Sequence, residues 1–108
     1  MIRLTVLYGQ PVDRAEFDRY YWDAHIPLAK KMRGSLRWTV EPVLVTPGEP
    51  LPPYHMVVGL YAASREVMER ILATPESQAA SADVANFATG GATYLSTEEH
   101  EIPLAGAL

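Results

Sequence analysis

The segment from Tyr54 to Ala63 constrains the fold of this chain more than any other part of the sequence. Its inner part, Met56 to Ala63, contains no charged residue. Successive side chains of a strand point to opposite faces of its sheet, so an uncharged strand has two apolar faces. We therefore predict that this strand is buried on both faces.

The other elements follow from periodicity and from residues that favour turns. The proline-rich segment 47–53 is typical of a loop. Pro42 favours an edge position or a bulge, because proline cannot donate to the hydrogen bonds of a sheet. The predicted strands cover residues 2–9, 37–46, 54–63 and 92–97, and the predicted helices run from Asp13 to near Gly34, from Ser64 through Leu72, and from Thr74 through Phe87.

The first helix has independent start signals. Asp13 and Glu16 have the spacing of a capping box, in which the Asp13 carboxylate accepts from free amides of the first turn. Val12 and Phe17 stand at the positions of a hydrophobic staple across that cap. Further along, Pro27 removes one amide donor, so we expect a kink or a break just before it and then another turn.

The predicted order, β-α-β-β-α-(α)-β, is that of a ferredoxin-like α+β domain: a βαββαβ chain whose four-stranded antiparallel sheet carries its helices on one face. We expect residues 1–108 to form one such domain. Helices on one side leave the other face of the sheet bare, and a bare apolar face favours association. We therefore expect a homodimer that pairs sheet face to sheet face.

Composition excludes several kinds of function. The chain has 9 Lys and Arg against 13 Asp and Glu, whereas nucleic-acid binding needs a clustered basic surface. It has no cysteine, so disulfides, thiolate nucleophiles and cysteine-based zinc sites are excluded. Its 3 histidines lie on different elements without metal-ligand spacing, so we expect no metal. The N-terminus leads directly into a strand and no apolar run approaches the roughly 20 residues that span a bilayer, so we expect a cytoplasmic protein with no signal peptide and no membrane partner.

The densest group of chemically active residues lies on the first helix. Helical geometry places His25 about 40° from Tyr21 and about 20° from Asp18, at the edge of the apolar stripe. An imidazole there can exchange protons near neutral pH, and Asp18 could hold its tautomer. Tyr20, Tyr21 and Trp22 would line a pocket suited to a flat small molecule. The alternative is that His25 is a structural residue bonded to a backbone carbonyl and that the aromatic residues are packing.

Other candidates are weaker. His55, next to Tyr54 at the start of the uncharged strand, would reach the same cleft if it faces the helices. No serine stands in a Gly-x-Ser-x-Gly elbow, so a hydrolase triad is not supported.

The helix sequence from Phe17 to Ala29 resembles the signature of the EthD family of dimeric α+β barrel proteins, and so does the segment from Thr74 to Gly91. The segments 6–9 and 53–55 also fit the family's pattern, and the resemblance extends from about Leu4 to Tyr94. It implies a ferredoxin-like protomer and a homodimer whose sheets form a barrel. Related barrels include polyketide cyclases, decarboxylases, dehydratases, isomerases and cofactor-free monooxygenases.

The resemblance implies a pocket between the first helix and the sheet, in which a His or Tyr moves protons on a small, often aromatic molecule. Our first hypothesis is a cofactor-free lyase or isomerase with His25 as general acid/base and Tyr21 orienting the substrate. The second is a non-catalytic binding or accessory protein of a degradation pathway that uses the same pocket. The expected substrate-binding residues are Tyr8, Asp18, Tyr20, Trp22, Tyr54 and His55.

Overall fold

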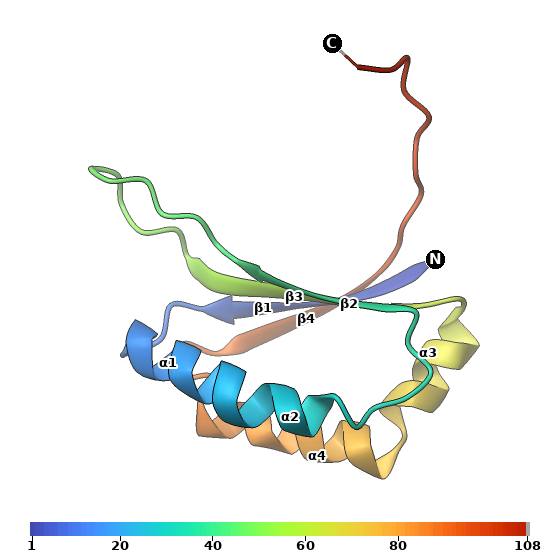
Figure 1. Cartoon of the computed structure of the whole chain (residues 1–108), viewed down its shortest axis with the longest axis horizontal. Coiled ribbons are helices and arrows are strands. Elements are labelled where there is room, and N and C mark those ends of the chain that lie inside the picture. Colours follow the sequence, from blue (N-terminus) through green and yellow to red (C-terminus); the bar gives the residue numbers. More distant parts are fainter. Residues whose placement is uncertain (108) are drawn as a thin grey trace.

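A computed structural model describes residues 1–107, in which the helices lie on one face of a four-stranded antiparallel sheet (Figure 1). The strands are β1 (Ile2–Gly9), β2 (Arg37–Pro42), β3 (Tyr54–Ala62) and β4 (Ala92–Glu98). The α-helices are α1 (Arg14–Tyr20), α2 (Ile26–Ala29), α3 (Arg65–Leu72) and α4 (Pro75–Asp83), with a π-helical turn η1 (Tyr21–His25) and a 3-10 turn η2 (Val84–Asn86). Within the described residues, no helix is long and apolar enough to cross a membrane.

The sheet has the strand order β2-β3-β1-β4, so the apolar strand β3 is central and β2 and β4 form the edges. This is the ferredoxin-like α+β fold expected from the order of elements. Pro42 ends the edge strand β2, as its missing amide predicts. β2 stops there and does not reach residue 46, although the amide of Val43 still donates to the carbonyl of His55 at 3.0 Å.

The caps of the helices form as predicted, with one exception. The carboxylate of Asp13 accepts from the amide of Glu16 at 3.0 Å, and Ser64 and Thr74 cap α3 and α4 in the same way. The predicted staple is wrong, because Val12 is 90% exposed. Its backbone amide bonds the Thr89 hydroxyl at 2.9 Å instead, which fixes the entry to the helix by a polar contact.

The helix does not break before Pro27, and the irregularity expected there takes the form of the π turn η1. The amide of Ile26 donates to the carbonyl of Tyr21, five residues back instead of four, and α2 continues from there to Ala29. Such a π turn adds a residue to one turn of the helix. The chain thereby passes a residue without an amide donor while remaining helical, and Pro27 falls in the first turn of α2, where its missing amide costs little.

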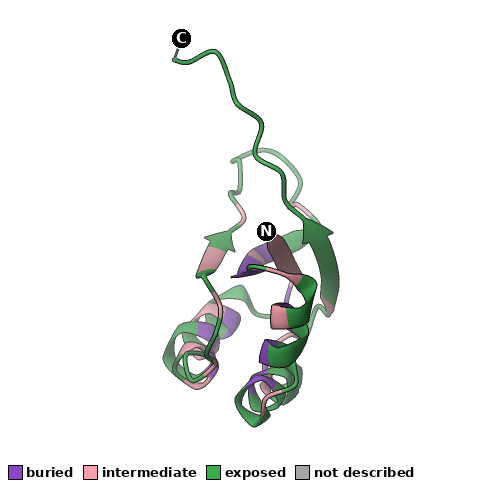
Figure 2. Ribbon diagram, turned by 90° about the vertical axis from the view of Figure 1, so that its right-hand side faces the viewer, coloured by how far each residue is buried: buried purple, intermediate pink, exposed green. Residues whose placement is uncertain are grey.

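The core lies between the helices and the inner face of the sheet (Figure 2). One cluster joins β1, α1 and β3 to Phe87, just after η2; the other lies between β3 and α3. At one end of the sheet, Gly9 and the loop before β4 meet backbone to backbone. A Cβ added to Gly9 would lie 2.3 Å from the carbonyl oxygen of Gly90, so only glycine fits there.

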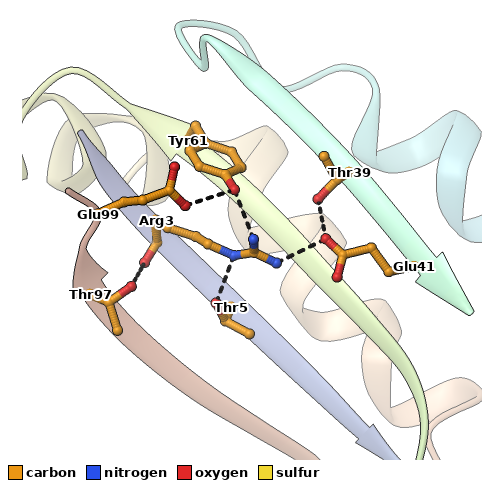
Figure 3. Close-up of polar contacts among 7 residues, drawn as sticks. All are labelled: Arg3, Thr5, Thr39, Glu41, Tyr61, Thr97 and Glu99. Atoms are coloured by element: carbon orange, nitrogen blue, oxygen red, sulfur yellow. Dashed lines mark hydrogen bonds and ion pairs between the residues drawn. The ribbon is translucent and has the colours of Figure 1, made fainter. Parts of the chain in front are cut away.

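The outer face of the sheet is not the bare apolar surface that the sequence predicts. Arg3 lies on the inner strand β1 near one end of the sheet, and it donates to the Tyr61 hydroxyl at 2.8 Å, to Glu41 at 3.0 Å and to Thr5 at 3.0 Å (Figure 3). Tyr61 in turn donates to Glu99 at 3.1 Å. β3 is therefore buried on both faces within one chain, as predicted, but one end of its outer face is covered by charged and polar side chains.

Candidate functional site

A cavity of about 100 Å³ lies between the helices and the sheet. Aliphatic side chains of β1 and β3 form its floor, and Trp38 of β2 closes one side. Tyr8, Tyr21 and His25 are among the residues that line it. The structure thus brings together three of the residues predicted from the sequence, in a space between the first helix and the sheet where a small molecule fits.

His25 is held by a residue that the sequence analysis did not identify. Its Nδ1 lies 2.9 Å from Oδ2 of Asp83, at the end of α4, and its side chain is only 7% exposed. An ionised carboxylate only accepts hydrogen bonds, so Nδ1 carries the proton in the neutral ring and Nε2 has a free lone pair. The predicted pairing of His25 with Asp18 is wrong.

Asp83 is itself fixed on several sides. Its Oδ1 accepts from the Tyr20 hydroxyl at 2.6 Å and from the Asn86 amide at 2.9 Å. Burial alone would raise the pKa of Asp83, but the hydrogen bonds from Tyr20, Asn86 and His25 outweigh it and lower the pKa below its ordinary value. Asp83 therefore stays ionised at neutral pH and keeps the His25 ring in one orientation. Tyr20 contacts this pair through its hydrogen bond to Asp83 and is not one of the residues that line the cavity.

The Nε2 atom of His25 is open to the cavity. Within residues 1–107 Nε2 has no hydrogen-bond partner. It is not a fully buried atom, because the one fully buried side-chain nitrogen or oxygen without a partner in this range is Oε1 of Gln10. Nε2 is therefore not enclosed by protein, and His25 is one of the residues that line the cavity. An imidazole oriented on one nitrogen by a carboxylate and free on the other is the arrangement of a general base.

Two buried phenols, those of Tyr8 and Tyr21, border the same space, and the half-exposed Tyr94 also lines it. Burial raises the pKa of the Tyr8 hydroxyl, with smaller contributions from the nearby Tyr21, Tyr94 and Asp83, and burial alone raises the pKa of Tyr21. Both phenols therefore stay protonated at neutral pH and can donate a hydrogen bond but cannot act as bases. Within the described residues neither hydroxyl has a hydrogen-bond partner, and both side chains are almost fully buried beside the cavity.

Phe87 packs the site from the side of α4. Its ring centroid lies 4.7 Å from that of His25, 5.5 Å from that of Tyr8 and 5.6 Å from that of Tyr21. The ring holds these side chains against the sheet.

His55 and Asp18 form a separate pair away from the cavity. The register between β1 and β3 shifts beyond Tyr8, and this irregularity leaves His55 outside the pairing. The ring packs on Phe17 at 4.9 Å, and its Nε2 lies 2.7 Å from Asp18. Nδ1 accepts from Arg14 at 3.4 Å, so both ring nitrogens are bonded. The pair ties α1 to the sheet and leaves no free nitrogen for a ligand.

The remaining predicted residues do not reach the cavity. Trp22 is 49% exposed and Tyr54 is 38% exposed, both on the surface of the chain. Within residues 1–107, no group of three or more metal-ligating side chains lies close enough to hold a metal ion.

One sequence signal could have identified Asp83. It is an acidic residue in the last turn of α4, where a negative charge opposes the helix dipole, and such a placement suggests a role other than helix stability.

Comparisons with known proteins agree with this architecture. Residues 9–91 match the family model of the EthD domain. An uncharacterised 11.0 kDa protein from the thcB–thcC intergenic region of Rhodococcus erythropolis is 37% identical over 102 residues, which cover 94% of this chain and 98% of that protein. The crystal structure of an EthD family protein from Bacillus halodurans matches with a TM-score of 0.84 and 28% identity, over 93% of this chain and 99% of that one.

A more distant structure shares the fold alone. A protein of unknown function from Bacteroides fragilis, described as dimeric and ferredoxin-like, matches with a TM-score of 0.63 and 16% identity, over 91% of this chain and 95% of that one. The family match and the Rhodococcus relative cover most of the sequence, including the helix that carries His25 and the segment that carries Asp83. The chain belongs to the EthD family.

Proposed function

We propose that this protein is a cofactor-independent lyase or isomerase that acts on a small molecule held between the helices and the sheet. His25 is the general acid/base, Asp83 positions it, and the phenols of Tyr8 and Tyr21 bind the substrate. The observation that carries the proposal is the His25–Asp83 pair, whose Nδ1 to Oδ2 distance of 2.9 Å leaves Nε2 free toward the cavity.

The arrangement suits proton transfer at a carbon next to a carbonyl group. Nε2 of His25 takes the proton from that carbon, and the electron pair of the broken C–H bond moves through the new C=C bond onto the carbonyl oxygen. A phenol of Tyr8 or Tyr21 donates to the resulting enolate. The imidazolium then returns its proton to the same carbon, to another carbon, or to a leaving hydroxyl, which gives exchange, isomerisation or dehydration respectively. A placed base of this kind contributes about 10²–10⁴-fold to the rate.

Hydrogen exchange tests the proposal without knowledge of the natural substrate. The protein is incubated in D₂O with a panel of single-ring ketones, beginning with acetophenone, and loss of the proton signal next to the carbonyl is followed by NMR. We expect exchange above the buffer rate that falls by about 10²-fold or more in His25→Asn. An equal rate in His25→Asn would refute the role of His25.

The second candidate function is a non-catalytic carrier that holds a pathway intermediate. The apolar lining of the cavity favours it, since such a surface binds a small molecule without chemistry. A panel in which ketones bind but none exchanges above the buffer rate would favour the carrier.

We further propose that the protein works as a homodimer joined through the outer faces of its sheets, as a dimeric α+β barrel. Beyond the polar group around Arg3, that face carries Leu7 and Val57 of the central strands, which are paired, and the 47%-exposed Leu95 of β4. The β2–β3 loop and the segment after β4 both project away from the helices on this side of the sheet (Figures 1 and 2). The Bacteroides fragilis protein of the same fold is described as dimeric, which agrees with the proposal.

A further inference from the structure

Of the described residues that line the cavity, none is a lysine or an arginine. The lining consists of aliphatic, thioether, aromatic and hydroxyl side chains together with His25, which is the only one of these described residues that can carry a positive charge. The carboxylate of Asp83 already pairs with His25, so a protonated ring and its partner together have no net charge. No cation in this lining is free to pair with an acidic ligand.

A buried charge without a partner is strongly disfavoured, because it loses its hydration and gains nothing in return. A carboxylate or phosphate in this cavity would also lie near Asp83, behind the His25 ring. An uncharged molecule meets neither penalty. Its single polar group would find an acceptor in His25 Nε2 and donors in the hydroxyls of Tyr8 and Tyr21.

The volume limits the size of the buried part. An engineered apolar cavity of about 150 Å³ in another protein binds benzene. The cavity here measures about 100 Å³, but it is not closed, since the exposed Ser81 and the 49%-exposed Tyr94 also border it. One ring, or a fragment of that size, fills it, and a longer molecule extends outward between α4 and β4.

We infer that the ligand is an uncharged molecule that buries a ring-sized apolar end with one carbonyl or hydroxyl group beside His25, and that the cavity rejects carboxylates and phosphates. The inference rests on the proposed function for the location of the site, and it adds the substrate class.

Two ligands of nearly equal shape test the inference. Acetophenone is uncharged at pH 8, whereas benzoate is an anion. Each is titrated into the protein, and binding is followed by NMR through the methyl groups of Val58 and Ala80, which line the cavity. We expect acetophenone to bind at least about tenfold more tightly than benzoate. Benzoate binding of equal or greater strength, or no binding of acetophenone at millimolar concentration, would overturn the inference.

A charge introduced at the border of the cavity provides a second test. Ser81→Lys places an ammonium group there from an exposed position on α4, and Ser81→Gln is the control of similar size without the charge. We expect Ser81→Lys to shift the preference toward benzoate by about fivefold relative to Ser81→Gln. Equal preference in the two variants would mean that charge does not govern selection, which contradicts the inference.

The experiments distinguish a wrong substrate class from a wrong catalytic role of His25. If benzoate binds well while ketone exchange still depends on His25, the substrate class is wrong and the catalytic role stands. If acetophenone is preferred but exchange is the same in His25→Asn, the substrate class stands and the catalytic role is wrong.

Discussion

Replacement of Asp83 by asparagine tests the central interaction of the site. The side-chain amide of the introduced asparagine donates to Nδ1 of His25, whereas the native carboxylate accepts from it at 2.9 Å. The imidazole must then carry its proton on Nε2, toward the cavity. We expect Asp83→Asn to remove the lone pair that takes up a proton and to reduce any His25-dependent exchange by about 10²–10⁴-fold.

The stability change follows from the hydrogen bonds that lose a charged acceptor. Asp83 accepts from Tyr20 at 2.6 Å, from His25 at 2.9 Å and from Asn86 at 2.9 Å. A hydrogen bond to a charged group contributes about 1.5–3 kcal/mol and a neutral one about 1 kcal/mol, so we expect the variant to lose about 2 kcal/mol in all. For a domain of this length, that lowers the Tm by about 8 °C.

The pH dependence of this loss has a definite sign. Folding lowers the pKa of Asp83 from its ordinary value of 3.8, so the carboxylate stabilises the fold above that pH and the stabilisation disappears as pH falls through the lower, folded value. The difference in Tm between the wild type and Asp83→Asn is therefore largest at neutral pH and shrinks below about pH 4.

The assay that decides the matter is ¹⁵N NMR of the histidine rings, which reports the tautomer without a substrate. We expect His25 to be protonated at Nδ1 in the wild type and at Nε2 in Asp83→Asn. Asp18→Asn is the matched control, because it makes the same chemical change beside His55 and leaves His25 untouched. An unchanged His25 tautomer in Asp83→Asn would refute the reasoning.

Two further predictions concern packing and assembly. Phe87→Ala removes a ring that is 4% exposed and lies against His25. We expect it to lower the free energy of unfolding by about 3–5 kcal/mol, measured by urea denaturation. A loss below about 1 kcal/mol would show that the surrounding side chains collapse into the gap. Val57→Lys places a charge on the outer face of the sheet and should yield monomers in sedimentation, whereas Ala79→Lys on the exposed side of α4 should not. Wild-type protein that sediments as a folded monomer at micromolar concentration would contradict the proposed dimer.

Local signals predicted the elements of this fold well. Asp13, Ser64 and Thr74 each cap a helix through a contact with a backbone amide three residues on, and such short-range chemistry is visible in the sequence. The uncharged segment at β3 and the proline at the end of β2 likewise report burial and edge position directly.

The partners of the site residues were not visible in the sequence, because they depend on which elements meet in space. His25 and Asp83 lie 58 positions apart, and their contact forms only when α4 packs beside the first helix. The arithmetic that paired His25 with Asp18 assumed a regular α-helix, and η1 changes the angle between the two positions. Arg3 is likewise far from Glu41 and Tyr61 in the sequence. The sequence therefore did not show that these side chains meet and cover part of the outer face of the sheet.

The π turn has a consequence for insertions and deletions along this helix. It amounts to one extra residue between two α-helical parts, each of which places its own side chains against the core: Phe17 before the turn and Ala29 after it. Deletion of the exposed Trp22 would restore an ordinary α-helix in which Phe17 and Ala29 still face the core, because the π turn is what absorbs the extra residue. Insertion of one more residue at the same place would instead turn α2 by about 100° and carry Ala29 away from the core. The segment between 21 and 25 should therefore tolerate the loss of one residue better than the gain of one.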